Sequence, residues 1–224
     1  CASANWGQRT DCEAVHDVIC DMRTDSTRII VRGLCRGSTV ALNMLSHGYL
    51  SGYNVRAMVL ESPTTSVREL IDRAASTKLR NVPYAGAILR GLLWWNCPQF
   101  KWAEDNDDQM ITRLRSKAHR VPILIGHIYN DPVVSNESML RLMRALRRNS
   151  GRDHSLHLLV LNSPKIDHAF MGLSRVFVGA MHAFYKKHGI SHDESLALRY
   201  EAVLQRAWEN TDKDNPSDWS LEID

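Results

Sequence analysis

Three residues in this chain carry side chains that together could perform nucleophilic catalysis, and the first of them is Cys35. It lies between two glycines in the stretch GLCRGS, directly after an apolar run and directly before a helix-like stretch. A Gly-x-Cys-x-Gly pattern in this setting is typical of a nucleophile elbow, the sharp strand-to-helix turn that lifts a nucleophile above a sheet. Gly33 and Gly37 are expected to prevent clashes at such a turn. A buried free cysteine is also a common core residue, so the pattern alone leaves both interpretations open.

An acid and a base follow Cys35 in the chain. Asp131 comes just after the apolar stretch ILIGHI, and His168 follows the apolar stretch HLLVLN. Taken singly, Asp131 could be a turn residue before Pro132, and His168 could simply stand near the start of a helix. Each of the three residues follows a different predicted strand, and open α/β sheets gather their functional groups at the carboxyl ends of strands. The order Cys, Asp, His therefore favours a nucleophile–acid–base triad, with the N–H of Arg36 as an oxyanion donor.

Other residues have weaker claims to a role in the chemistry. Glu61 ends the second predicted strand and is the reserve acid if Asp131 points away. His127 lies within a strand and is expected to be a structural histidine, while Ser38 is expected to be a helix N-terminal residue. Four aromatic residues could line a substrate site or form a small core of their own: Trp94, Trp95, Phe100 and Trp102.

Short apolar segments alternate with helical patterns along the chain. The predicted strands are Arg28–Val31, Val55–Leu60, Val121–Ile128 and Ser155–Leu161, each rich in Val, Ile or Leu. The predicted helices are Cys12–Met22, Ser38–His47, Ser135–Arg148 and Ala169–His188. This alternation predicts an α/β fold, a three-layer sandwich around a mostly parallel sheet.

Two regions interrupt this alternation and suggest the domain organisation. Residues 62–120 are far longer than an ordinary crossover connection, so we interpret them as a helical cap inserted into a core of residues 1–61 and 121–190. Residues 191–224 contain an amphipathic helix over 193–208, followed by a polar, acidic tail that is expected to be loose.

Composition narrows the class of protein. A formal net charge of +3 over 224 residues gives no argument for a nucleic-acid partner. No apolar run reaches the roughly 18 residues that a membrane span needs. The five cysteines show no metal-ligand spacing, and their odd number favours reduced thiols and a cytoplasmic location. No metal and no organic cofactor are implied.

With these motifs in hand, the chain resembles the α/β-hydrolase superfamily over about residues 5–190. GLCRGS is similar to the Gly-x-Ser-x-Gly elbow of that superfamily, and more closely to its cysteine version in dienelactone hydrolases. ILIGHIYNDPVVS and VLESPTTSVREL resemble segments of the serine aminopeptidase and dipeptidyl-peptidase-like branches. The resemblance implies an α/β-hydrolase-like sheet with a helical cap. It also implies Cys35 as nucleophile, Asp131 as acid and His168 as base toward a small acyl substrate.

Two departures from the superfamily pattern qualify this interpretation. Cys35 replaces the usual serine, although a Cys–His pair can also attack carbonyl carbons. The strands that normally precede the elbow strand, and the loop that supplies the second oxyanion N–H, have no counterpart. The strand at 28–31 is therefore expected to be a bare sheet edge. We expect the chain to be a fragment, or its edge to be covered by a homodimer mate or a second chain.

Two functions follow from the sequence. The first is a hydrolase of a carboxylic ester, thioester or small amide that acts through Cys35, His168 and Asp131. The alternative is a catalytically inactive α/β-hydrolase-like module that binds a ligand or a protein partner.

Overall fold

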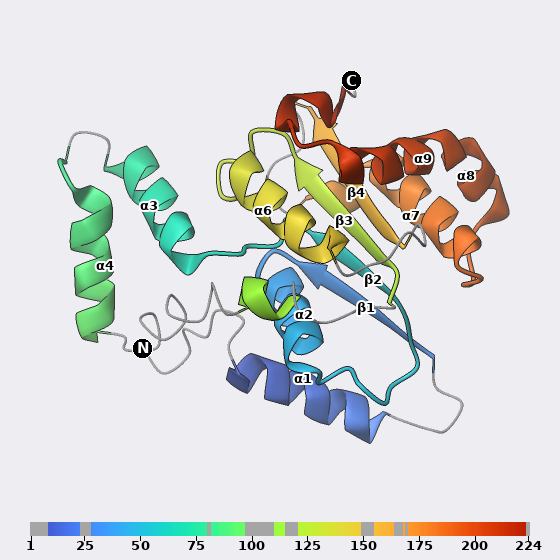
Figure 1. The fold of residues 1–224 in the computed structure, drawn as a ribbon, viewed down its shortest axis with the longest axis horizontal. Coiled ribbons are helices and arrows are strands. Elements are labelled where there is room, and N and C mark those ends of the chain that lie inside the picture. The colour runs from blue at the N-terminus through green and yellow to red at the C-terminus, as the bar shows by residue number, and fades with distance from the viewer. Residues whose placement is uncertain are drawn as a thin grey trace.

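The centre of the molecule is a five-stranded sheet with the strand order β1-β2-β3-β4-β5 (Figure 1). The computed structural model describes residues 9–22, 28–79, 82–96, 110–114, 121–148, 155–163, 168 and 170–222. Each neighbouring pair of strands is parallel. The strands are β1 Ile29–Leu34, β2 Val55–Glu61, β3 Ile123–Ile128, β4 Leu156–Asn162 and β5 Ser220–Glu222.

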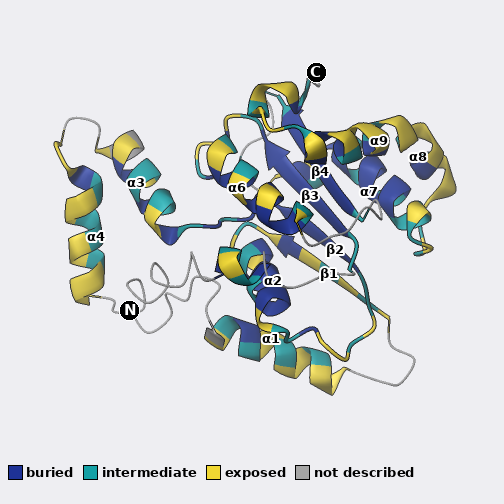
Figure 2. Ribbon diagram, in the orientation of Figure 1, coloured by how far each residue is buried: buried dark blue, intermediate teal, exposed yellow. Residues whose placement is uncertain are grey.

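Helices cover both faces of this sheet, and alternate strand residues point into two separate cores. On one face lie α1 (Arg9–Asp21), α2 (Arg36–His47) and α6 (Asn136–Arg147), which pack with Met58 and Leu60 of β2. On the other face lie α7 (Arg175–Lys187), α8 (Glu194–Arg199) and α9 (Glu201–Glu209). The core on that side includes Ala57 and Val59 of β2, and the buried centre of the sheet is plain in Figure 2. The predicted three-layer α/β sandwich is therefore confirmed.

The four predicted strands are all present, with shifted ends. β1 runs three residues beyond its predicted end, to Leu34, so that the strand leads directly into Cys35. The helix predicted to start at Ala169 begins only at Arg175, because the hydroxyl of Ser174 caps it by accepting the N–H of Phe177.

The predicted helix over 193–208 is two helices, α8 and α9, which meet at Tyr200. The ring of Tyr200 lies so close to Gly179 of α7 that a Cβ on Gly179 would come within 2.0 Å of it. The break therefore accompanies the seating of this ring against α7, and Leu204 and Ala207 of α9 join the core on that face of the sheet.

The polar tail was expected to be loose, and that expectation is wrong. Residues Asn210–Asp212 and Pro216–Asp218 form 3₁₀ turns, and β5 adds to the sheet beside β4. Trp219 is 0% exposed, and the amide nitrogen of Asn210 donates to the carbonyls of both Leu158 and Trp219 at 3.0 Å. One buried tryptophan and one buried amide thus attach the tail to the core.

The region predicted to be a cap contains α3 (Val67–Lys78), α4 (Ala85–Asn96) and a helical piece at 110–114. In Figure 1, α3 and α4 lie to one side of the sheet and its covering helices. Trp95 of α4 is 88% exposed, so it belongs to no core among the described residues. Met110 and Leu114 join the main core instead. Phe100 and Trp102 lie outside the described residues, and the limits 62–120 of the cap stay a prediction.

Within the described residues, β1 pairs only with β2 and forms one edge of the sheet. Two apolar residues of β1 are exposed, Ile30 at 41% and Leu34 at 49%. That a homodimer mate or a second chain covers this edge stays a prediction. No helix in the described part of the chain is long and apolar enough to pass through a membrane.

Candidate active site

Cys35 occupies a strained turn between β1 and α2. Its backbone has φ 49° and ψ −111°, a conformation that side-chain-bearing residues rarely adopt. Its N–H donates to the carbonyl of Glu61 at 2.8 Å, while its own carbonyl accepts the N–H groups of Ser38 and Thr39. The turn is thereby fastened to β2 on one side and to the first turn of α2 on the other.

Of the two glycines that flank Cys35, only Gly33 is needed for steric reasons. A Cβ at Gly33 would lie 2.6 Å from both the N and the Cα of Ser38 and 2.7 Å from the carbonyl carbon of Gly37. These are backbone atoms and cannot move aside cheaply. The expectation that Gly37 also prevents a clash is wrong, because a Cβ added there would meet nothing within 4 Å.

Ser38 ties the turn at Cys35 to the neighbouring strand β2. Its hydroxyl donates to the carbonyl of Glu61 at 2.9 Å and accepts the N–H of Glu61 at 3.0 Å. The side chain is fully buried in this double contact. This agrees with a structural role near the helix N-terminus and leaves the hydroxyl engaged by two backbone groups.

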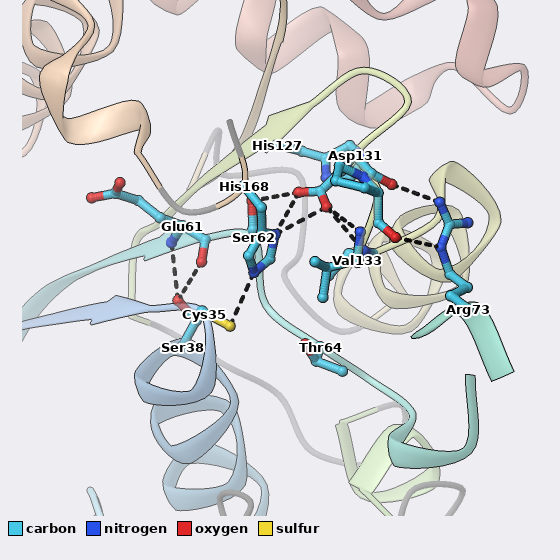
Figure 3. A network of polar contacts seen from close by, with 12 residues as sticks. Cys35, Ser38, Glu61, Ser62, Thr64, Arg73, His127, Asp131, Val133 and His168 are labelled. Atoms are coloured by element: carbon cyan, nitrogen blue, oxygen red, sulfur yellow. Dashed lines mark hydrogen bonds and ion pairs between the residues drawn. The ribbon is translucent and has the colours of Figure 1, made fainter. Parts of the chain in front are cut away.

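The structure brings the side chains of Cys35, His168 and Asp131 into a single chain of contacts (Figure 3). The Nε2 of His168 lies 3.0 Å from the Sγ of Cys35. The Nδ1 of His168 lies 2.8 and 2.9 Å from the two carboxylate oxygens of Asp131. The imidazole therefore bridges the sulfur and the carboxylate, as a nucleophile–base–acid arrangement requires.

A set of hydrogen bonds holds the carboxylate of Asp131, which is fully buried. The N–H groups of Val133 and Val134 donate to Oδ1 at 2.7 and 3.0 Å. The hydroxyl of Ser62 donates to Oδ2 at 3.2 Å. Nothing in the sequence singles out Ser62, which follows β2 some 69 positions from its partner.

These contacts shift the protonation equilibria of both partners. Burial by itself would raise the pKa of Asp131, but hydrogen bonds from His168 and the two valine amides lower it below its usual value. Burial alone would lower the pKa of His168, yet its bonds to Asp131 and Cys35 outweigh this and raise it to about 9. At neutral pH, His168 is therefore an imidazolium that faces both an acid and a sulfur atom.

Arg36 is the first residue of α2, and its N–H is one of the amides that a helix leaves without a partner in its own first turn. This places a backbone donor immediately after the sulfur-bearing residue. The Arg36 side chain points elsewhere, and its guanidinium contacts the carboxylate of Asp11 on α1 at 2.9 and 3.1 Å.

Glu61, the reserve acid, has different partners. Its carboxylate accepts the guanidinium of Arg32 at 2.8 Å and the N–H of Gly172 at 2.9 Å, and it points away from His168 in Figure 3. Glu61 and Arg32 line a cavity of ≈ 510 Å³ together with Gly33, Leu34, Phe170, Gly172 and Leu173. Because Asp131 already holds His168, Glu61 takes no part in the contacts that join Cys35, His168 and Asp131.

His127 is buried in β3, and its Nε2 contacts the side-chain oxygen of Asn136 at 2.9 Å. Burial lowers the pKa of His127 below its usual value, so the ring is neutral at physiological pH. A neutral, hydrogen-bonded ring agrees with the structural role expected for it. In the described residues, no group of His, Cys, Asp and Glu side chains could hold a metal ion.

The segment that follows His168 rests directly on the sheet. A Cβ at Gly126 of β3 would lie 2.6 Å from the ring of Phe177 and 2.8 Å from the sulfur of Met171. Met171 is fully buried and begins the 3₁₀ turn Met171–Leu173, three residues after His168. The absence of a side chain at Gly126 thus sets how closely this segment approaches β3.

Comparisons with known proteins give a likeness in structure alone. No protein-family model and no curated protein matches the chain. A structure of the Pyrococcus furiosus esterase Pf2001 aligns with a TM-score of 0.50 and 14% identity, over 92% of this chain and 64% of the esterase. A second crystal form of that esterase aligns with a TM-score of 0.48 and 16% identity, over 88% and 61%. The chain thus spans less than two thirds of the length of the esterase, and its parallel sheet, flanked by helices on both faces, has an α/β-hydrolase-like fold.

Proposed function

We propose that the chain is a hydrolase of carboxylic esters, thioesters or small amides in which Cys35 is the nucleophile. The observation that carries this proposal is the 3.0 Å contact between the Sγ of Cys35 and the Nε2 of His168, made at a strained strand-to-helix turn. His168 is in turn oriented by a buried carboxylate 2.8 Å away. A core cysteine would need neither the strain nor the oriented imidazole.

In the first half of the reaction, a thiolate at Cys35 faces the imidazolium of His168. The thiolate attacks the carbonyl carbon and forms a C–S bond, while the carbonyl electrons move to oxygen. The N–H of Arg36 donates to this oxyanion. When the carbonyl re-forms, the bond to the leaving oxygen, sulfur or nitrogen breaks, and the leaving atom takes the Nε2 proton of His168. The products are a free alcohol, thiol or amine and an acyl-cysteine.

In the second half, neutral His168 accepts a proton from water, and the resulting hydroxide attacks the acyl carbon. The tetrahedral intermediate collapses with cleavage of the C–S bond, which releases the carboxylic acid and restores the thiolate and imidazolium. Asp131 stays ionised throughout, since its role is to hold Nδ1 and stabilise the charged ring.

Two assays test this proposal without knowledge of the natural substrate. Cys35 is expected to react with iodoacetamide at pH 7 faster than Cys20, which is exposed on α1 and serves as the internal control. The purified chain is expected to hydrolyse p-nitrophenyl acetate, and Cys35→Ala is expected to lose that activity while Cys20→Ala keeps it. Hydrolysis that survives in Cys35→Ala would refute the nucleophile. Fast labelling of Cys35 without any turnover would instead favour the inactive binding module.

A further inference from the structure

Helix α3 is joined at two points to the loop that carries Asp131. The guanidinium of Arg73 donates from Nη2 to the carbonyl of Asp131 at 2.6 Å and from Nε to the carbonyl of Pro132 at 3.2 Å (Figure 3). One helical turn earlier, the carboxylate of Glu69 accepts the hydroxyl of Ser135, the residue that caps α6. A helix of the predicted cap region is thus fastened to both ends of the segment 131–135.

The contact between Arg73 and Pro132 bears directly on how Asp131 is held. The carbonyl of Pro132 and the N–H of Val133 belong to the same planar peptide unit and point in opposite directions. Arg73 binds the carbonyl, and the N–H on the other side of that unit donates to Oδ1 of Asp131 at 2.7 Å. Because the peptide unit is planar, holding the carbonyl of Pro132 also fixes the direction of the Val133 N–H.

Two features of the loop that carries Asp131 suggest that it needs the contacts from Arg73. Asn130, just before Asp131, has a φ of 58°, a left-handed conformation that costs a side-chain-bearing residue free energy. The acidic residue that follows is fully buried, so its carboxylate depends on the donors that the loop presents. A cation that gathers two successive carbonyls is well suited to hold a loop in this shape.

We propose that Arg73 is a positioning residue for the candidate triad: by orienting the Pro132–Val133 peptide, it keeps the carboxylate of Asp131 directed at His168. This inference rests on the proposed function for its catalytic meaning. The geometry of Asp131 and His168 can be measured whether or not the chain hydrolyses anything.

The direct test is a titration of the ring nitrogens of His168 by NMR in the wild-type chain, in Arg73→Gln and in Arg68→Gln. Arg68 is exposed on the same helix, so its substitution removes the same charge from α3. The wild-type midpoint should lie at about 9. In Arg73→Gln it should fall by about one pH unit or more toward the ordinary value of about 6.5, because Asp131 faces the ring less often. Arg68→Gln should titrate like the wild type.

Activity provides a second readout. With p-nitrophenyl acetate, Arg73→Gln should lower kcat about tenfold or more with KM nearly unchanged. Arg73→Lys, which keeps the charge but loses the two-pronged donor, should fall between Arg73→Gln and the wild type, and added guanidinium should partly restore Arg73→Ala. If Arg73→Gln does not fold, Arg73→Lys and the rescue of Arg73→Ala carry the test.

An unchanged His168 midpoint in a folded Arg73 variant would overturn the positioning role, because a residue that merely attaches α3 would alter only thermal stability. Absence of hydrolysis in the wild-type chain would instead count against the proposed function, and the titration would still decide the role of Arg73.

Discussion

Alanine at the two glycines that flank Cys35 should have opposite effects on stability. A Cβ at Gly33 would meet three backbone atoms of the next turn at 2.6 to 2.7 Å, whereas a Cβ at Gly37 would meet nothing within 4 Å. Overpacking against atoms that cannot rotate away costs about 3 kcal/mol. Gly37 lies in helix α2 with open space around it, so alanine there should stabilise the fold by about 0.5 kcal/mol through a less flexible unfolded chain.

The two variants should therefore differ by about 3.5 kcal/mol in their free energy of unfolding, or about 10 °C in Tm for a chain of this length. Thermal and urea unfolding of Gly33→Ala, Gly37→Ala and the wild type measure this difference directly. Gly33→Ala should also slow the labelling of Cys35 by iodoacetamide, because relief of the clash moves Ser38 and with it the turn. Equal destabilisation by both alanines would refute this account of the turn at Cys35, and so would a Gly33→Ala chain as stable as the wild type.

Two further predictions concern the base and the tail. The pKa of His168 is raised from 6.5 to about 9 on folding, so its stabilising contribution is complete below pH 6.5 and is lost as the pH rises through about 9. Wild-type stability, measured by urea unfolding at several pH values, should thus fall by at most about 3.4 kcal/mol over this range. A His168→Gln chain whose stability falls as much between the same pH values would contradict the contact with Asp131. Trp219→Ala should cost about 3–5 kcal/mol, because a fully buried indole is replaced by a cavity. A Tm unchanged by that substitution would mean that the tail is not part of the core.

Four of the five described strands could be predicted from sequence because each is a short apolar segment, whereas β5 lies in the polar tail and was not predicted. The positions of these predicted strands also predicted that Cys35, Asp131 and His168 lie close together, since the carboxyl ends of parallel strands share one edge of the sheet. Local patterns find Cys35 and its turn, but they do not say that Gly37 has open space while Gly33 has none. That difference depends on how the first turn of α2 packs over the end of β1.

Contacts between distant residues account for what could not be predicted. Ser62 and Arg73 reach Asp131 from 69 and 58 positions away, and nothing in their own neighbourhoods marks them. The tail appeared loose because its composition is polar, although Trp219 and Asn210 are both buried and β5 pairs with β4. Average composition is a poor guide where a segment that is polar overall buries one large aromatic side chain.

The close packing beneath the His168 segment has a consequence for attempts to engineer this chain. Gly126 admits Met171 and Phe177 so closely that any larger residue at that position must push the segment outward. The height of the imidazole over the sheet is thus adjustable from below, by residues that are themselves fully buried. Libraries that vary Met171 and Phe177 should therefore yield variants in which the rate of the proposed hydrolysis and the melting temperature change together. Selection for one property would then change the other as well.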